Sequence, residues 1–434
     1  MKSKHQIKLL FNAEILISGL QSGACRSGIF FASYNILKEL IKNKDIDLTL
    51  YVNFKLYKHL KLNLKRLIDI DFYNINLITD ASLIFIDLYY KFRKLKDSAR
   101  DNNYYLKKIF YHYMLFFVSI ILKVSFYLKY LCNCKYRNYD VYFSPFKKFP
   151  KNIIKVKNIQ KCLVLYDCIP ILYPQYYASY GKKFWFNKLV KSLNHDDTYF
   201  AISESTRQDF IKNCPKIDPN KIHTTLLACD EKFVPCDNDM IQKARAKYNI
   251  PLDKRYVFSL CTLEPRKNLI RAVKTFVEFI KKNNIEDMVF VLGGGQWDNF
   301  IKQLEKELGS LGEYKDKIIK AGYVADEDLA PLYSGAEWFV YTSQYEGFGM
   351  PPLEAMSSGC PVITSNNSSL PEVVGDAGIM IDWDSDQQHI DAYEKYYFNT
   401  ELREQYRQKG LERSKQFTWK KCVDKMVEVM LNDK

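Results

Sequence analysis

The stretch that decides the fold is YTSQYEGFGMPPLEAMSSGCPVITSNNSSLPEVVG, residues 341–375. Within it, Glu346 and Glu354 are separated by seven residues that include two glycines and two prolines. This composition places Glu346 in a loop, whereas Glu354 can lie at the start of a helix. The glycines expose backbone N–H groups near a helix N-terminus, which is a binding site for an anion such as phosphate. Two carboxylates beside such a site would repel phosphate, so we expect them to accept hydrogen bonds from the hydroxyls of a ribose and of a transferred sugar.

A second informative stretch is LCTLEPRKNLIRAVKTF, residues 260–276. It predicts a strand that ends at Leu263, with Arg266 and Lys267 just before a helix. Adjacent Arg and Lys side chains at the carboxyl end of a strand can neutralise a diphosphate, the guanidinium by paired hydrogen bonds and the ammonium as a point charge. A solvated basic turn is the alternative. The presence of the Glu346 loop in the same half of the chain favours the ligand site.

Short apolar runs alternate with helical stretches along most of the chain, which predicts an α/β architecture of parallel sheets covered on both faces. In the first half, residues 11–20 are predicted to form a buried strand, followed by a glycine-bearing loop and a helix over residues 29–41. In the second half, the predicted strands are residues 255–263, 288–295, 317–324, 337–343, 361–366 and 378–382. Two doubly wound domains in series would bind a ligand in the cleft between them, at the carboxyl ends of the strands.

Positive charge is concentrated in the first part of the 434-residue chain. Residues 1–250 hold 41 Lys and Arg against 21 Asp and Glu, whereas residues 251–434 hold 23 against 29. This asymmetry indicates that only the first half meets an anionic surface such as phospholipid, nucleic acid or polyphosphate. A charge that serves solubility alone is the alternative. A nucleic-acid-binding protein is a rival class, but the sequence holds no recognisable motif for reading nucleic acid.

Residues 87–137 interrupt the alternation with an aromatic-rich segment that holds eleven Lys and Arg and three Asp. We predict one or two amphipathic helices inserted in the first domain. Aromatic rings beside basic residues are typical of helices that lie in the interface of a membrane, and an ordinary core helix with solvated lysines is the alternative. The most apolar part, residues 109–122, has 14 residues without a formal charge, short of the roughly 20 that span a bilayer.

The cysteines and the N-terminus indicate a cytoplasmic protein. The eleven cysteines have no framework spacing, which argues against a disulfide scaffold. The N-terminus lacks the long apolar core and the cleavage site of a signal peptide. We expect no metal site, since Cys132 and Cys134 form one isolated pair and the Asp-x-Asp match at residues 382–384 lies beyond both informative stretches.

Together these motifs resemble the retaining glycosyltransferases of family 4, the glycosyl transferases group 1, which have the GT-B fold. The motifs of the second half are Glu346-x7-Glu354, EPRKN (264–268), GYV (322–324) and the SGxPVI run (358–363), and they cover about residues 250–385. In the first half the resemblance is thinner and rests on the strand-glycine loop, YDCIPILYP (166–174) and ISESTRQD (202–209). It implies two doubly wound Rossmann-like domains that face a central cleft. We place these domains at residues 1–235, which would bind the acceptor, and at residues 236–415, which would bind the sugar nucleotide, and we expect a C-terminal helix over residues 416–434 to cross back to the first domain.

The resemblance implies a role for each charged residue of the site. Arg266 and Lys267 would hold the diphosphate of the donor, and Glu354 would bind its ribose hydroxyls. Glu346 would contact the donor sugar.

The resemblance also implies roles for several uncharged residues. Backbone amides would hold the sugar and the distal phosphate, namely those around Phe348, Gly349 and Met350. Tyr323 and Val324 would line the base pocket. Gly19 would lie against the diphosphate when the cleft closes.

One departure from the family pattern is Tyr166-Asp167, where many relatives have His-Asp. Tyrosine cannot replace an imidazole base near neutral pH. A front-face retaining displacement needs no such base, because the leaving phosphate can take the proton of the acceptor. We therefore expect Tyr166, on the acceptor side, to change the sugar or acceptor preference, with loss of activity as the alternative. Asp167 would orient the acceptor hydroxyl or the donor sugar, or it would cap a turn.

The resemblance implies a retaining hexosyltransferase of bacterial surface polysaccharide assembly, such as that of O-antigen or capsule. GDP-mannose is the first expectation for the donor, and UDP- or dTDP-sugars stay open. A sugar-nucleotide epimerase or a glycan phosphorylase is a rival that explains Glu346 together with Glu354 less well. No cofactor or metal is expected, because cationic side chains would take the place of Mg²⁺. The expected partners are a glycan or polyprenyl-linked acceptor and the anionic inner face of the cell membrane.

Overall fold

The computed structural model describes residues 6–20, 28–53, 56–57, 76–79, 83–101, 105–132, 136–177, 180–262, 264–295 and 298–433. By contacts, the chain divides into two compact units. Unit 1 comprises residues 1–164, 192–200 and 425–434, and unit 2 comprises residues 165–191 and 201–424. These contact-based units do not divide the chain at residue 235. The predicted domain boundary at residue 235 stays a prediction.

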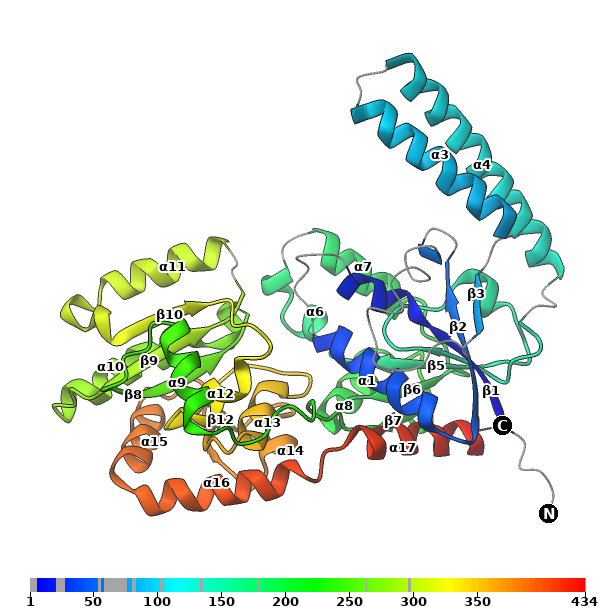
Figure 1. The fold of residues 1–434 in the computed structure, drawn as a ribbon. Coiled ribbons are helices and arrows are strands. Elements are labelled where there is room, and N and C mark those ends of the chain that lie inside the picture. The colour runs from blue at the N-terminus through cyan, green and yellow to red at the C-terminus, as the bar shows by residue number, and fades with distance from the viewer. Residues whose placement is uncertain are drawn as a thin grey trace. The chain divides into compact units, whose positions relative to one another are not determined.

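The first sheet has seven strands in the order β3-β2-β1-β4-β5-β6-β7 (Figure 1). Strands β1 to β5 pair in parallel, with Leu9 of β1 opposite Leu48 of β2 and Val141 of β4. The strand bounds are β1 Ile7–Asn12, β2 Ile46–Val52, β3 Asn76–Thr79, β4 Val141–Ser144, β5 Gln160–Leu165, β6 Thr198–Ala201 and β7 Ile222–Thr224. The strand order reverses between β1 and β4, and ligands of doubly wound sheets bind at such a reversal.

The prediction of a strand over residues 11–20 was wrong. The strand β1 ends at Asn12, and the 3-10 helix η1 follows over Ala13–Leu20. The side-chain oxygen Oδ1 of Asn12 accepts a hydrogen bond of 3.0 Å from the backbone N–H of Glu14. Such a local side-chain contact competes with the sheet ladder and turns the chain out of the strand.

The second sheet has six strands in the order β10-β9-β8-β11-β12-β13, and its pairs are parallel. The bounds are β8 Arg255–Leu260, β9 Met288–Gly293, β10 Ile318–Gly322, β11 Trp338–Tyr341, β12 Val362–Ser365 and β13 Ile379–Ile381. Every residue of β9 is buried, as expected of a parallel strand covered on both faces. Here the order reverses between β8 and β11, so the loops after these two strands meet at one edge of the sheet.

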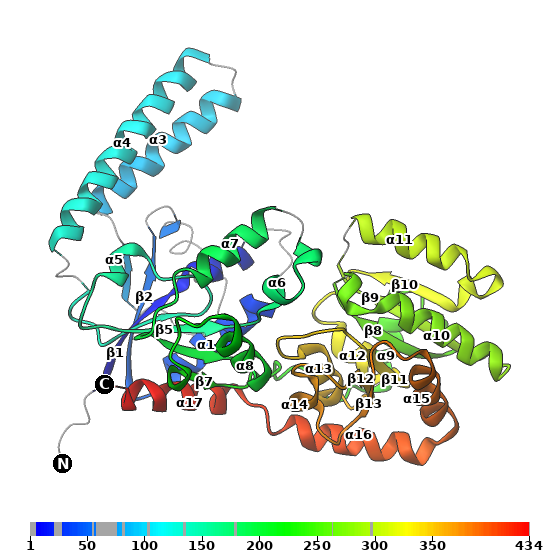
Figure 2. The ribbon, with the colours of Figure 1, turned by 180° about the vertical axis from the view of Figure 1, so that it is seen from behind.

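Helices lie on both sides of each sheet, as the two views show (Figures 1 and 2). The longer helices are α1 Gly28–Lys42, α3 Leu83–Asp101, α4 Tyr105–Cys132, α7 Tyr180–Val190, α8 Glu204–Asn213, α9 Asn238–Lys247, α10 Leu269–Lys282, α11 Asp298–Gly309, α13 Met350–Ser357, α15 Asp386–Phe398, α16 Thr400–Ser414 and α17 Trp419–Asn432. The shorter ones are α5 Lys151–Ile154, α6 Ile169–Leu172, η3 Pro174–Tyr177, η4 Pro219–Lys221, η5 Pro265–Lys267, η6 Gly312–Lys317, α12 Leu329–Ser334 and α14 Leu370–Val374.

The core of unit 2 is rich in aromatic side chains. Tyr393 of α15 is fully buried against Phe276 and Phe279 of α10, with ring centroids 6.2 and 5.8 Å apart. Its hydroxyl donates to the carbonyl of Ala272, at 3.1 Å. This packing fixes α10, and therefore fixes the turn η5 that precedes it.

The aromatic segment predicted at residues 87–137 contains two helices, α3 and α4, which pack against each other as a hairpin. Nζ of Lys96 on α3 lies 3.1 Å from Nδ1 of His112 on α4. Among the α4 side chains that the structure describes, six apolar ones are exposed, namely Ile109, Phe110, Tyr113, Phe116, Phe117 and Ile120. In the described part of the chain, neither these helices nor any other could cross a membrane by length and apolarity.

The last helix, α17, has an apolar face as its periodicity predicts. Trp419 at its start donates from Nε1 to the carbonyl of Cys229, at 3.1 Å, in unit 2. Residues 425–434 belong to unit 1, where Oδ2 of Asp433 accepts a hydrogen bond of 3.1 Å from Thr198. The chain therefore returns to unit 1 at its C-terminus.

Candidate active site

The turn that holds Arg266 and Lys267 follows β8, which ends at Leu260 and not at Leu263 as predicted. Leu263 itself lies outside the described residues. The backbone N–H of Glu264 donates to the carbonyl of Thr262, and Pro265 has no N–H to extend a sheet ladder. The 3-10 helix η5 then carries both cations to the edge where the strand order reverses.

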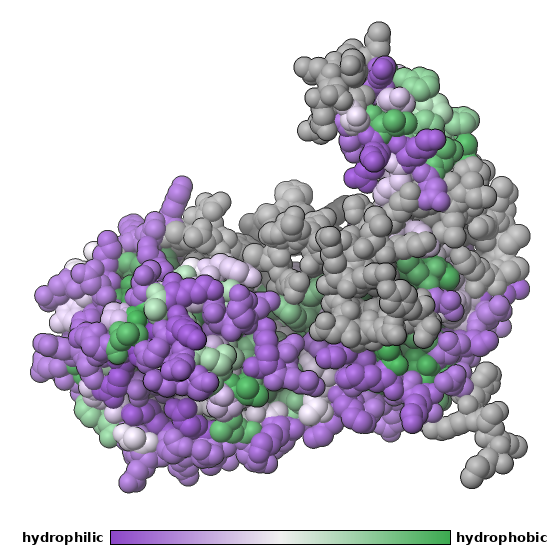
Figure 3. Space-filling view, in the orientation of Figure 1, coloured by the Kyte–Doolittle hydropathy of each residue, from purple (hydrophilic) through white to green (hydrophobic). Residues whose placement is uncertain are grey.

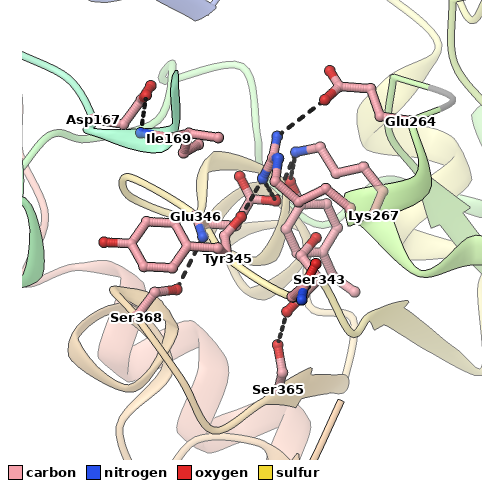
Figure 4. A network of polar contacts seen from close by, with 12 residues as sticks. Asp167, Ile169, Glu264, Lys267, Ser343, Tyr345, Glu346, Ser365 and Ser368 are labelled. Carbon is pink, nitrogen blue, oxygen red and sulfur yellow. Dashed lines mark hydrogen bonds and ion pairs between the residues drawn. The ribbon is translucent and has the colours of Figure 1, made fainter. Parts of the chain in front are cut away.

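Glu346 pairs with both cations, and Figure 4 shows it close to Lys267. Its Oε1 is 3.0 Å from Nη1 of Arg266 and 2.7 Å from Nζ of Lys267. Nζ of Lys267 also donates to the hydroxyl of Tyr341, at 2.7 Å. The structure thus brings Glu346 to two cations that lie about 80 positions earlier in the chain, because the loops after β8 and β11 are neighbours.

The ionisation of Glu346 is set by these neighbours. Burial disfavours the carboxylate, but the charges of Arg266 and Lys267 outweigh it and lower the pKa of Glu346 to about 2. Glu346 is therefore ionised at neutral pH, and two cations share one carboxylate. Arg266, Lys267 and Glu346 together carry one positive charge, which Glu264, with Oε2 3.5 Å from Nη2 of Arg266, partly offsets. An anion that binds here would take over cation contacts that these carboxylates now make.

The loop after Glu346 leads into α13, and each of its two glycines is required for a different reason. Gly349 has a φ of 133°, a conformation that side chains rarely adopt. A Cβ on Gly347 would lie 2.4 Å from the carbonyl oxygen of Tyr166. Phe348 between them is buried, and α13 begins at Met350 and continues with two prolines. Pro351 and Pro352 have no N–H. The backbone N–H groups that could bind a ligand at the start of α13 are therefore those of residues 348–350.

Glu354 lies in α13, one turn after Met350. Its Oε2 accepts a hydrogen bond of 3.1 Å from the hydroxyl of Tyr333. Burial raises the pKa of Glu354 to about 7, since that single hydrogen bond and the charge of Lys232 do not offset the desolvation. Glu354 is therefore near its midpoint of protonation at neutral pH, in contrast to Glu346.

The two residues predicted for the base pocket follow β10. Tyr323 is 58% exposed, whereas Val324 is buried. Val324 lies near the end of β9, where a Cβ on Gly293 would be 3.0 Å from its Cγ2. A Cβ on the next residue, Gly294, would clash with the carbonyl of Cys261, so these strand ends form a tightly packed backbone surface beside Tyr323.

Asp167 has the turn-capping contact that the sequence left open as one alternative. Its Oδ1 accepts a hydrogen bond of 3.0 Å from the N–H of Ile169, at the start of α6. Burial raises the pKa of Asp167. Tyr166 contributes its carbonyl, which accepts a hydrogen bond of 3.0 Å from Thr206. The predicted contacts of Asp167 and Tyr166 with donor or acceptor stay predictions.

Gly19 lies in η1 of unit 1, whereas the other predicted site residues lie in unit 2. Its role against the diphosphate stays a prediction. Among the residues that the structure describes, no group of three or more His, Cys, Asp or Glu side chains is arranged to hold a metal ion.

Sequence reasoning missed three residues that contact this loop from the side of α8, namely Ser203, Thr206 and Asp209. Ser203 is the N-cap of α8, and its Oγ accepts a hydrogen bond from the N–H of Thr206, at 3.0 Å. The same hydroxyl donates to the carbonyl of Gly347, at 2.7 Å. Asp209 of α8 accepts a hydrogen bond from the hydroxyl of Tyr345. The cap signal marks Ser203, but no local pattern shows that these side chains reach a loop about 140 residues away.

Comparisons with known proteins show which sequences and structures this chain is similar to. Residues 240–413 match the sequence family described as "Glycosyl transferases group 1". Over 299 residues the chain is 30% identical to O-antigen chain mannosyltransferase B of Escherichia coli, an alignment that covers 67% of this chain and 74% of that protein. It is 29% identical over 272 residues to the serotype-specific mannosyltransferase WbdA of Escherichia coli, which covers 61% of this chain and 32% of that protein. The chain therefore spans about a third of the length of WbdA.

A solved structure shows the same fold. The crystal structure of HepE from Anabaena, in complex with UDP and glucose, has a TM-score of 0.64 to this chain at 14% sequence identity. The similarity covers 98% of this chain and 100% of that one. The predicted GT-B fold with two Rossmann-like parallel sheets is confirmed.

Proposed function

Because the chain belongs to the glycosyl transferases group 1 family, we propose that it transfers a mannosyl unit from GDP-mannose, with retention of the anomeric configuration. The acceptor would be a glycan or a lipid-linked oligosaccharide of a bacterial surface polysaccharide. The observation that carries the proposal is the cluster of Arg266, Lys267 and Glu346 at the strand-order reversal. The names of the two Escherichia coli relatives support mannose as the sugar.

Arg266 and Lys267 would bind the diphosphate of the donor. In the structure both cations pair with Glu346, so the positive charge is held in place before an anion arrives. Negative charge grows on the diphosphate as the bond to the sugar breaks, and preorganised cations stabilise that transition state. Because these side chains supply the charge that Mg²⁺ provides elsewhere, we propose that transfer is independent of metal.

The other site residues would hold the rest of the donor. Glu354 would bind the ribose hydroxyls, and Tyr323 with Val324 would line the base pocket. The backbone N–H groups of residues 348–350 would bind the sugar and the distal phosphate.

Glu346 would contact the sugar through its other carboxylate oxygen, Oε2, while Oε1 stays paired with the cations. The acceptor would approach from the side of Asp167 and Tyr166, and the leaving diphosphate would take its proton, so no side chain needs to act as the base.

A first experiment is thermal unfolding in the presence of GDP, UDP or dTDP, with and without a chelator. A ligand that binds only the folded state stabilises it by about 2.7 kcal/mol at a hundredfold excess over its Kd. We expect GDP to raise the Tm with chelator present, and Lys267→Ala to abolish the rise. A rise with UDP or dTDP alone would make the enzyme a transferase for that sugar nucleotide.

A second experiment is NMR of the product formed from GDP-mannose, which decides the mechanism. An α-linked product from the α-linked donor is expected for retention. A β-linked product would contradict the retaining mechanism, and conversion of the free nucleotide sugar without an acceptor would favour an epimerase.

We also propose that the α3–α4 hairpin binds an anionic membrane surface at the inner face of the cell membrane, where a lipid-linked acceptor lies. The exposed side chains of α4 at positions 110, 113, 116, 117 and 120 recur every three or four residues and therefore share one face of the helix. Figure 3 shows hydrophobic side chains gathered along one side of the described part of this hairpin.

The charge of the hairpin favours lipid over a second copy of the chain. Helix α4 holds four lysines and no acidic residue, and α3 adds the exposed Lys91, Arg93 and Lys94 against the exposed Asp87 and Asp97. Two such faces would repel each other, whereas aromatic rings with flanking cations suit the interface of an anionic bilayer.

A further inference from the structure

The loop that carries Glu346 is held from one side by the first turns of α8. The hydroxyls of Ser203 and Thr206 both donate to the carbonyl of Gly347, at 2.7 and 3.1 Å. Glu372 accepts hydrogen bonds from the N–H groups of Glu204 and Ser205, at 2.6 and 2.7 Å. All these residues belong to unit 2, so the contacts form one continuous polar interface.

Tyr345 lies at the centre of this interface and uses both its backbone and its side chain. Its carbonyl accepts a hydrogen bond from Nη1 of Arg266, and its hydroxyl donates to Oδ2 of Asp209. The ring is buried and packs against Tyr173, with centroids 5.5 Å apart. A single residue therefore connects the guanidinium of the site to helix α8.

The guanidinium of Arg266 also contacts two carboxylates. It is 3.0 Å from Glu346 and 3.5 Å from Glu264. Both partners are carboxylates, and Glu346 is itself shared with Lys267. The carbonyl of Tyr345 is a fixed backbone acceptor, provided that the side chain of Tyr345 holds the peptide in place.

We propose that Tyr345 and Asp209 are positioning residues of the transfer reaction, whose hydrogen bond fixes the peptide that orients Arg266 toward the leaving diphosphate. The inference rests on the proposed function and extends its machinery to a residue of α8. Neither side chain needs to touch the substrate. Their effect reaches the reaction through the direction of the guanidinium.

The proposal has a pH signature, because Asp209 must be ionised to be a strong acceptor. Burial and the charge of Asp167 raise the pKa of Asp209 to about 6, against the opposing charge of Lys212. The titratable or charged groups around Asp209 are Asp167, Cys168, Tyr173, Lys212 and Tyr345. Above pH 6 the carboxylate accepts from Tyr345. Below pH 6 it gains a proton, and the hydrogen bond weakens.

The test compares Tyr345→Phe, Asp209→Asn and the double variant in release of GDP from GDP-mannose with an acceptor. We expect Tyr345→Phe to lower kcat about tenfold, the effect of one lost hydrogen bond. The double variant should be no slower than Tyr345→Phe, because without the Tyr345 hydroxyl the side chain at position 209 has no hydrogen bond to this residue left to lose. At saturating donor, kcat of the wild type should fall below pH 6, and Asp209→Asn should remove this fall, since its amide oxygen still accepts from Tyr345.

A matched control is Tyr396→Phe, which removes another buried hydroxyl, one that donates to the carbonyl of Val362 at 3.0 Å. It should change kcat less than twofold at every pH. A purely structural role for Tyr345 predicts instead lower urea midpoints, additive effects and an unchanged pH profile, and that result would overturn the proposal. If the wild type releases no nucleoside diphosphate from any of GDP-mannose, UDP-glucose and dTDP-rhamnose, the proposed function is wrong and this inference falls with it. Normal turnover by Tyr345→Phe would refute the inference alone.

Discussion

The two glutamates of one short motif have opposite electrostatic environments. Glu346 lies between two cations, which hold its pKa at about 2, whereas burial with one tyrosine partner raises the pKa of Glu354 to about 7. The difference fits different ligands. A carboxylate already paired with cations can share them with a diphosphate, and a buried carboxylate with a single donor can gain further donors from a ribose.

This difference predicts how nucleotide affinity depends on pH. In the proposed function, ribose hydroxyls would donate to the ionised form of Glu354. Binding would then favour deprotonation, and the affinity for GDP should fall as the pH drops below 7. The limit is about tenfold for each pH unit, the slope of a single proton. Calorimetric titration with GDP between pH 5.5 and pH 8.5 measures this slope.

The matched variant is Glu354→Gln, which cannot titrate but keeps a side-chain oxygen. It should bind GDP more weakly at pH 8 and should lose the part of the pH dependence that belongs to Glu354. The remaining slope would be that of the terminal phosphate of GDP, which both proteins share. Equal slopes in the two proteins would show that Glu354 does not titrate on binding.

At the scale of elements, the loop of residues 344–349 is held between η5 and the segment that leads from β5 into α6. The backbone N–H of Gln344 donates to the carbonyl of Arg266, at 2.8 Å. On the other side, Gly347 contacts the backbone of Tyr166 so closely that it has no room for a side chain. The position of the loop therefore depends on two elements that lie 80 and 180 residues earlier in the chain.

Gly347→Ala should consequently destabilise the protein by about 1–3 kcal/mol, the usual cost of overpacking. The added Cβ would lie 2.4 Å from the carbonyl oxygen of Tyr166 and 3.0 Å from Cβ of Asp167. Since the loop must move, turnover should fall by more than the loss of stability explains. Urea unfolding and kcat/KM measure the two effects.

Gly309→Ala is the control, because a Cβ at the end of α11 meets nothing within 4 Å. Its unfolding free energy should stay within about 0.5 kcal/mol of the wild type, as is usual for an unconstrained surface position. If Gly347→Ala matched this control in stability and in turnover, the close packing against Tyr166 would be refuted.

The elements also show how far the sequence could predict the fold. Buried parallel strands such as β9 were predictable because their apolar runs are continuous, and the loop of Glu346 was predictable from its glycines and prolines. The end of β1 was not, because the Asn12 side chain turns the chain within an unbroken apolar run. The contacts of Tyr345 and Asp209 were not either, since no local pattern records a hydrogen bond between residues 136 positions apart.

At the scale of the whole molecule, the excess positive charge and the exposed aromatic residues occur in the same part of the chain. Residues 1–250 hold the entire positive excess, and the α3–α4 hairpin within them exposes the apolar face of α4. Phe116 is 62% exposed, and Phe110 and Phe117 are each 58% exposed. An enzyme with a lipid-linked acceptor gains from such a surface, because binding to the membrane raises the local concentration of the acceptor.

Sedimentation with lipid vesicles tests this surface. The protein should sediment with vesicles that contain phosphatidylglycerol at low salt, and less with phosphatidylcholine alone or at high salt, because salt screens the lysines. Replacing Phe110, Phe116 and Phe117 together by Ser should reduce binding more than tenfold, since burying each ring in the interface contributes about 1.5 kcal/mol or more.

The same variant should lose transfer to a lipid-linked acceptor but keep transfer to a short soluble acceptor, because the hairpin holds none of the residues proposed for the donor site. Phe398→Ser, which changes a phenylalanine that is 63% exposed in unit 2, should leave binding unchanged. Equal sedimentation of the triple variant and the wild type would exclude the apolar face of α4 as the membrane contact.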